Sequence, residues 1–428
     1  MEDLIHFLTL QDPNVRFVVI GMILLSISSA SVGTFAFLQK RALTGDTIAH
    51  SVLPGICLAF IMFDTRNLWV LLGGAFVTGW LSILAVDYIT AKSKLKPDTA
   101  IGLILSVFFG VGIVLLTYIQ QSGNAAQSGL NNFLFGKAAA MQPEDIITMG
   151  IVSVVITIVV LIGYRSFMVL SFDAAFAQSS GLPVKLLQLT LTTITVIAVA
   201  AGIQAVGVVL MAAMLITPAA AAKYWTNSLR VMLLLAVLFA IIGSIVGVYV
   251  SYSNNKMPTG PWIVTMISAI ALSSIIFAPK KGVAWKWIRR RQYINKSLRE
   301  NILKEVYHLE EKNPGKHLFT KQEILTERPM PVRTLDRGFS MLLRRRLIAR
   351  VAGGYMLTVQ GKSEGMRITR IHRLWELYLT QQLQLPSDHV HDDAEGIEHV
   401  ITPDMEARLI ELLNRPEKDP HEQTIPYN

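Results

Sequence analysis

Two polar side chains interrupt an apolar stretch near the start of the chain, and their types suit a metal ion. Asp46 and His50 open a run that is otherwise apolar as far as Phe63. Residues four apart share one face of a helix, so this carboxylate and imidazole could hold one divalent ion between them. Ionisable groups at membrane depth cost about 2.5 to 3.5 kcal/mol each, which makes them candidates for function. From the spacing alone, a capping role for Asp46 and a helix–helix bond for His50 are equally possible.

A second group of metal-binding residue types lies near the C-terminus. It consists of three imidazoles and three carboxylates: His372, Glu376, His391, Glu395, Glu398 and His399. Spacings of three and four residues place side chains of this group on one face of a helix. Since no thiolate accompanies them, they favour a harder divalent ion such as Mn(II) or Fe(II), although zinc would also bind tightly. The alternative is a charged helix face in contact with solvent.

The elements that position these side chains fall into two parts. The chain has 428 residues, of which 52% are hydrophobic and 16% charged, and its mean hydropathy is +0.46. This composition excludes an average soluble protein. Apolar runs dominate up to about Pro279 and the rest is polar, which indicates a membrane part and a soluble tail. The single cysteine, Cys57, excludes an intrachain disulfide and a zinc site of several thiolates.

The membrane part predicts nine transmembrane helices, because a span requires about 20 mostly apolar residues. The expected spans are 15–38, 47–63, 68–89, 100–119, 146–162, 186–203, 206–222, 231–252 and 262–277. Lys and Arg gather in alternate loops, so the positive-inside rule predicts an external N-terminus and a cytoplasmic tail. The very short turn between the sixth and seventh spans leaves a count of eight open. We therefore expect an all-α polytopic membrane protein.

Two connecting segments differ from simple loops. Residues 131–141 are semi-apolar and predict a short interfacial or re-entrant helix on the outer side. Residues 171–181 predict a short cytoplasmic helix of small residues that ends at Gly181. Such a helix either docks onto a partner protein or packs as an intracellular loop, and its residues alone favour neither.

Four stretches of the membrane part resemble the permease subunit of ABC-type importers for manganese, zinc or iron. They read LTGDTIAHSVLPG (43–55), PDTAIG (97–102), LFG (134–136) and LITPAAA (215–221). The similarity runs over about residues 1–279. The resemblance implies that Asp46 and His50 take part in metal passage.

The same resemblance implies the partners of this chain. The segment 171–181 would dock onto a separate ATP-binding cassette subunit, with coupling contacts at Asp173, Phe176, Ala177 and Gly181. Two permeases would pair around one path in the bacterial inner membrane, and an extracytoplasmic metal-binding protein would serve them. The chain itself is not expected to hydrolyse ATP. Gly361-Lys362-Ser363 imitates the end of a P-loop, but Met356 stands where the first glycine would be needed.

The tail predicts two small domains after a basic linker at 280–297. The expected elements are helices at 301–312, 320–326 and 332–347, a two-stranded wing at 349–358 and a long helix at 366–383. This order is typical of a winged helix-turn-helix domain over 298–365, followed by a helical metal-binding and dimerisation domain over 366–428.

The tail resembles the diphtheria-toxin-repressor-like family of iron- and manganese-dependent regulators. The six His and Glu side chains fall on or beside that family's metal-ligand positions, and Glu395 stands where iron-type members have Cys. Asn301 stands where manganese-type members have Asp, and Lys304 stands where they have Glu. Whether the tail binds DNA stays open, because a domain tethered to the membrane would have to bring DNA there.

Together these patterns predict a permease subunit of an ATP-driven importer of divalent transition metal ions, fused to a cytoplasmic metal-responsive domain. Manganese ranks first as the ion, followed by iron or zinc. Two alternatives stay open. One is a membrane-anchored, metal-dependent DNA-binding regulator, and the other is a secondary transporter that works without an ATPase.

Overall fold

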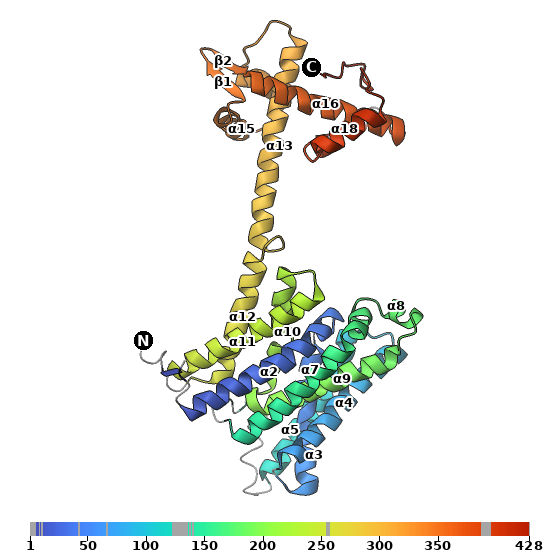
Figure 1. Cartoon of the computed structure of the whole chain (residues 1–428), viewed down its shortest axis with the longest axis vertical. Helices are drawn as coiled ribbons and strands as arrows, with labels where there is room; N and C mark the ends of the chain where they lie inside the picture. Colours follow the sequence, from blue (N-terminus) through green and yellow to red (C-terminus); the bar gives the residue numbers. More distant parts are fainter. Residues whose placement is uncertain are drawn as a thin grey trace. The chain divides into compact units, whose positions relative to one another are not determined.

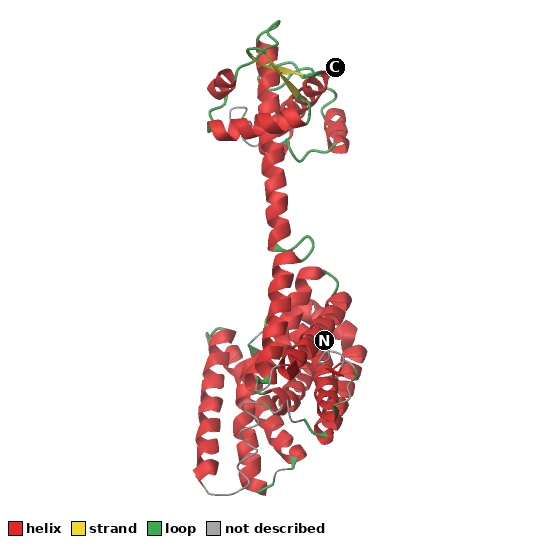
Figure 2. Cartoon of the chain, turned by 90° about the vertical axis from the view of Figure 1, so that its left-hand side faces the viewer, coloured by secondary structure: helices red, strands yellow, loops and turns green. Residues whose placement is uncertain are grey.

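The computed structural model describes residues 6–7, 9, 12–41, 43–65, 67–121, 136, 138, 141–253, 257–386 and 395–427. The chain divides into two units, Met1–Trp285 and Lys286–Asn428 (Figure 1). Helices dominate both units, and the sheet formed by the described residues has two strands (Figure 2).

The first unit is a bundle of long apolar helices. In chain order they are α2 (Pro13–Leu38), α3 (Thr44–Phe63), α4 (Leu68–Lys92), α5 (Pro97–Gln121), α7 (Pro143–Phe172), α8 (Ala174–Ser179), α9 (Val184–Val206), α10 (Val208–Trp225), α11 (Leu229–Ser253) and α12 (Thr259–Phe277). Eight of the described helices, all of these except α8 and α10, are long and apolar enough to cross a membrane. Since α10 occupies the remaining predicted span with 18 residues, the predicted all-α membrane architecture is confirmed.

Two boundaries in this unit differ from the predicted spans. A single residue, Gly207, separates α9 from α10, and its φ of 81° is a left-handed conformation that glycine adopts without steric penalty. α7 continues beyond the predicted span at 146–162 as far as Phe172, after which Asp173 caps α8. Most of the predicted outer segment at 131–141 lies outside the described residues.

Close backbone contact holds α3, the helix that carries Asp46 and His50, against its neighbours. α3 packs against α4 and α5. A Cβ added at Gly55 would lie 2.1 Å from the carbonyl oxygen of Gly74 on α4, so this crossing requires glycine. By contrast, no described atom lies within 4 Å of a Cβ added at Gly73.

The second unit combines helices with a two-stranded wing. Its elements are α13 (Val283–Lys312), which begins just before the unit boundary, α14 (Lys321–Glu327), α15 (Val332–Arg344), β1 (Ile348–Val351), β2 (Gly354–Leu357), α16 (Val359–Gln382) and α18 (Pro403–Leu412). The strands pair antiparallel, with Ile348 opposite Leu357 and Gly353 in the turn at a φ of 95°. This order confirms the predicted winged-helix architecture.

Buried apolar side chains hold the winged helix together, among them Ile302, Phe319, Ile324, Leu335 and Phe339. α13 is longer than predicted, because the basic stretch at 280–297 is helical from Val283 onward. α16 also starts earlier than predicted, at Val359, where the hydroxyl of Thr358 accepts a hydrogen bond from the amide of Gly361.

Candidate metal sites

In the membrane unit, Asp46 and His50 lie one turn apart on α3. Nε2 of His50 is 3.5 Å from Oδ1 of Asp46. Between Thr44 and Cys57, only Thr44, Asp46 and His50 are not fully buried. Two ligands that share one divalent ion at about 2.1 Å each lie about 3.0 to 3.4 Å apart. The 3.5 Å separation is about 0.1 Å above this range, a gap that a small rotation of either side chain would close.

The contacts of this pair do not match the alternative roles of capping and helix–helix bonding. The N-cap residue of α3 is Leu43, which forms no side-chain cap hydrogen bond. Nδ1 of His50 is buried and has no hydrogen-bond partner in the described part of the chain. The His50 ring packs edge-on against Phe109 of α5, with 4.8 Å between ring centroids. Packing thus orients the imidazole toward Asp46.

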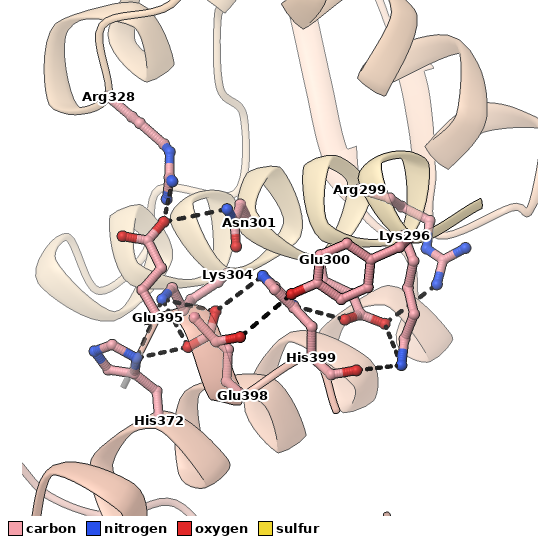
Figure 3. Close-up of polar contacts among 12 residues, drawn as sticks. Lys296, Arg299, Glu300, Asn301, Lys304, Arg328, His372, Glu395, Glu398 and His399 are labelled. Carbon is pink, nitrogen blue, oxygen red and sulfur yellow. Dashed lines mark hydrogen bonds and ion pairs between the residues drawn. The ribbon is translucent and has the colours of Figure 1, made fainter. Parts of the chain in front are cut away.

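In the tail, two of the predicted ligands meet a lysine (Figure 3). Lys304 comes from α13, His372 from α16, and Glu398 from a turn that follows the helical residues 395–397. Nζ of Lys304 lies 3.0 and 2.9 Å from the two oxygens of Glu398 and 3.4 Å from Nδ1 of His372. The same Nδ1 is 2.6 Å from Oε2 of Glu398. Nε2 of His372 is 3.1 Å from Oε1 of Glu376, as the spacing on one helix predicts.

Glu395 and His399 have further partners, although Nε2 of His399 also lies 3.7 Å from Oε1 of Glu398. Arg328 forms an ion pair with Glu395, and Nδ2 of Asn301 donates to Oε1 of the same carboxylate at 3.1 Å. Nδ1 of His399 is 2.8 Å from Oε2 of Glu300. The buried Nε2 of His399 has no hydrogen-bond partner among the described residues. His391 lies outside the described residues.

Burial and charge act in opposite directions on the pKa values of this cluster. Burial raises the pKa of Glu398, but the hydrogen bond from His372 and the charge of Lys304 outweigh it, so the net shift is downward. Burial lowers the pKa of His372, yet hydrogen bonds to Glu376 and Glu398 produce a net rise. Burial also raises the pKa of Glu395, and the hydrogen bond and charge of Arg328 outweigh it. The charged forms of His372 and Glu398 therefore stabilise each other, and Arg328 stabilises the charged form of Glu395.

This arrangement does not fit a metal ion held by the predicted set. A shared ion would separate Nδ1 of His372 from the Glu398 oxygens by about 3 Å, whereas the closest pair is 2.6 Å apart. Within the described ranges, no group of three or more His, Cys, Asp and Glu side chains is arranged to hold a metal ion. Metal binding by these six residues stays a prediction.

The predicted docking segment forms the short helix α8. Oδ1 of Asp173 accepts a hydrogen bond of 2.9 Å from the amide of Phe176 at its start. Gly181, with a φ of 78°, follows its end. Ala177 is buried against the bundle, whereas Phe176 is 59% exposed. The helix thus has fixed ends and presents an aromatic ring to the surroundings.

Comparison with known proteins identifies the membrane unit. The family model described as ABC 3 transport family matches residues 11–278. The chain belongs to this family. A second model, described as iron dependent repressor, metal binding and dimerisation domain, matches residues 358–427. This ABC 3 family member is therefore a multi-pass membrane permease with a fused repressor-type domain.

Its relatives are metal transport proteins. The manganese transport system membrane protein MntC of Bacillus subtilis (strain 168) is 39% identical over 380 residues, which cover 89% of this chain and 87% of that protein. The zinc transport system membrane protein TroC of Treponema pallidum (strain Nichols) is 39% identical over 281 residues, covering 66% of this chain and 94% of that protein. The solved structure of PsaBC from Streptococcus pneumoniae in complex with Fab is 30% identical, with a TM-score of 0.59, and covers 68% of this chain and 99% of that one.

The cationic partners of the tail cluster are not evident from the sequence of this permease. Lys304 stands out as a departure from a ligand pattern, but its contact with Glu398 depends on how α13 packs against a segment 94 residues away. Arg328 follows α14 and belongs to no motif. One signal does exist, because Lys304 lies three residues after Asn301 and so shares its face of the helix.

Proposed function

We propose that this chain is the permease subunit of an ATP-driven importer of divalent transition metal ions. Manganese is the proposed ion, with iron and zinc as the next candidates. Family membership supports the permease role, and the manganese relative that aligns over most of the chain supports the ion. The proposal depends above all on one observation, the 3.5 Å separation of Oδ1 of Asp46 from Nε2 of His50 on α3.

A two-ligand site suits an ion that must leave again. Structural sites for transition metals use about four protein ligands, whereas conduction requires binding weak enough for release. An ion passing along α3 would exchange water for the Asp46 carboxylate and the His50 imidazole. A second copy of the chain would add an equivalent pair, so we propose a homodimer around one path in the bacterial inner membrane.

We propose α8 as the docking element for a separate ATP-binding cassette subunit. Its exposed Phe176 offers an aromatic anchor, and the cap at Asp173 holds the helix in shape. The basic residues of alternate loops support a cytoplasmic position for α8 and for the tail. An extracytoplasmic metal-binding protein would then deliver the ion from the opposite side.

Metal uptake by the reconstituted complex tests this proposal. Asp46→Ala and His50→Ala should each lower manganese uptake by at least about tenfold, since even groups that only orient metal ligands contribute about 10- to 100-fold. Asp64→Asn is a matched control at the end of the same helix, because Asn tolerates the left-handed φ of 43° at that position. Parental uptake by the double alanine variant would contradict the proposal. Uptake without ATP would instead favour a secondary transporter.

A second candidate is a membrane-anchored, metal-dependent DNA-binding regulator. The winged-helix order favours it, as does a basic pocket of 670 Å³ whose lining includes Lys296, Arg299, Arg344 and Arg345. Phosphate contacts from such residues would weaken as salt rises. Sequence-specific duplex binding by the full chain in lipid nanodiscs would support this candidate, and the absence of sequence preference would remove it.

A further inference from the structure

Two of the predicted metal ligands of the tail, His372 and Glu398, contact a buried ammonium group (Figure 3). The side chain of Lys304 is 4% exposed, and that of Glu398 is fully buried. Nζ of Lys304 contacts both oxygens of Glu398, at 3.0 and 2.9 Å. A buried positive charge requires such compensation, because an unpaired ion is strongly disfavoured away from water.

Two carboxylates of this cluster already have fixed cations as partners. Lys304 compensates Glu398, and Arg328 compensates Glu395. Asn301 adds a hydrogen bond of 3.1 Å to Glu395. An ion entering this space would therefore meet two carboxylates that already have fixed cations. It would also lie beside the ammonium of Lys304, and like charges repel.

The distances leave no position for an ion between the two closest groups. Nδ1 of His372 and Oε2 of Glu398 are 2.6 Å apart, which is a direct hydrogen bond from the imidazole. A metal ligand must give up that proton, and a shared ion would hold the two atoms about 3 Å apart. The His372 ring instead bridges two carboxylates, since its Nε2 is 3.1 Å from Glu376.

We propose that Lys304 is a resident cation that takes the place of a divalent metal ion in this cluster. Its ammonium joins residues of α13, α16 and the turn at 398–400, as a metal would by binding ligands from each. The tail therefore assembles in the same way whether or not manganese is present. This differs from the metal-responsive role that the sequence predicts. The inference concerns the tail alone, so it stands or falls separately from transport along α3.

Manganese binding by the full chain tests this inference. The background carries Asp46→Ala and His50→Ala, which removes the membrane pair, and bound manganese is counted from the EPR signal of the free ion. With Lys304 present, the tail should bind no manganese. Lys304→Glu should gain one tightly bound ion per chain, because a third carboxylate replaces the cation and the buried Nε2 of His399, which has no hydrogen-bond partner among the described residues, can join it.

Lys312→Glu is the matched control on the same helix. The Lys312 side chain is 60% exposed and pairs with Glu327 at 3.0 Å, so this substitution adds a carboxylate to α13 while Lys304 keeps its contacts with Glu398, and it should gain no tightly bound ion. Manganese affinities that agree within about tenfold between the background chain and its Lys304→Glu variant would overturn the inference. A folded Lys304→Glu chain that binds no manganese would overturn it as well.

Hydrogen exchange on the unmodified chain gives a second test that needs no substitution. Protection of α13, α16 and residues 395–399 should be the same in chelator and in excess manganese. Protection that rises on addition of manganese would show that the ion binds the folded cluster, and would contradict a resident cation.

Discussion

The membrane unit and the tail each bring a carboxylate and an imidazole together, with opposite results. On α3, Asp46 and His50 are 3.5 Å apart, which is close to the separation that one shared ion requires. In the tail, His372 and Glu398 are 2.6 Å apart and bonded to each other. Lys304 then supplies the positive charge that a metal would otherwise bring. Similar residue types and helical spacing therefore do not by themselves define a metal site, and a neighbouring fixed cation decides the outcome.

The largest expected effect comes from removing the cation of the tail. Lys304→Met leaves the buried Glu398 without its lysine partner, which typically lowers the free energy of unfolding by about 3 to 5 kcal/mol. Hydrogen exchange across α13 and α16 would measure this loss. Lys312→Met, whose side chain is 60% exposed, should change stability by less than about 0.5 kcal/mol. Equal losses from the two substitutions would break the comparison.

The next largest loss of stability is expected where α3, the helix that carries Asp46 and His50, packs against α4. Gly55→Ala places a methyl group against the backbone of Gly74 and should cost about 3 kcal/mol, because α3 and α4 must separate. Thermal unfolding in detergent would detect it, and manganese uptake should fall with it. Gly73→Ala, next to the same contact, meets no described atom within 4 Å and should be neutral or slightly stabilising. Similar behaviour of both variants would mean that this crossing does not fix α3.

The stability of the tail should depend on pH through His308, which lies among positively charged side chains. Burial, together with the charges of Arg373 and Lys304, lowers the pKa of His308 from 6.5 to about 4. The unfolded chain therefore binds the proton first, and the free energy of unfolding falls as pH drops from about 6.5 toward 4. Between pH 7 and 5 the loss is about 2 kcal/mol. His308→Gln should lack this part of the pH dependence of tail stability, and identical pH profiles for variant and parent would exclude the effect.

The smallest predicted effect concerns the proposed docking helix α8 of the membrane unit. Phe176→Ala should reduce ATP-dependent uptake by about tenfold, because it removes the aromatic side chain that α8 presents to the proposed ATPase. Metal binding at Asp46 and His50 should stay unchanged. Tyr118→Ala on α5 is the control, since this side chain is also an exposed aromatic, at 65%. A larger loss from the control would place the docking surface elsewhere.

The architecture could be predicted from the sequence because long apolar runs and turn residues determine local structure. The spans, the pair on α3, the α8 segment and the wing all follow from residues close together in the chain. The ends of the helices were harder to predict. Nothing between 283 and 297 marks a stop in helix formation, so α13 begins at Val283.

The contents of the tail cluster depend on contacts between distant segments. Helical spacing correctly brings His372 toward Glu376. It does not show which groups Lys304, Arg328 and Glu300 contact, because these side chains reach their partners only after α13 and α14 have packed. The charge balance that decides between metal and lysine is thus a property of the tertiary fold.

Manganese uptake by the reconstituted complex tests the contrast between the two clusters most directly. Three chains are compared: the parent, the Asp46→Ala and His50→Ala double variant, and Glu398→Gln. The account predicts that the double variant loses uptake, whereas Glu398→Gln retains the parental rate. Parental uptake by the double variant, with loss in Glu398→Gln, would contradict it.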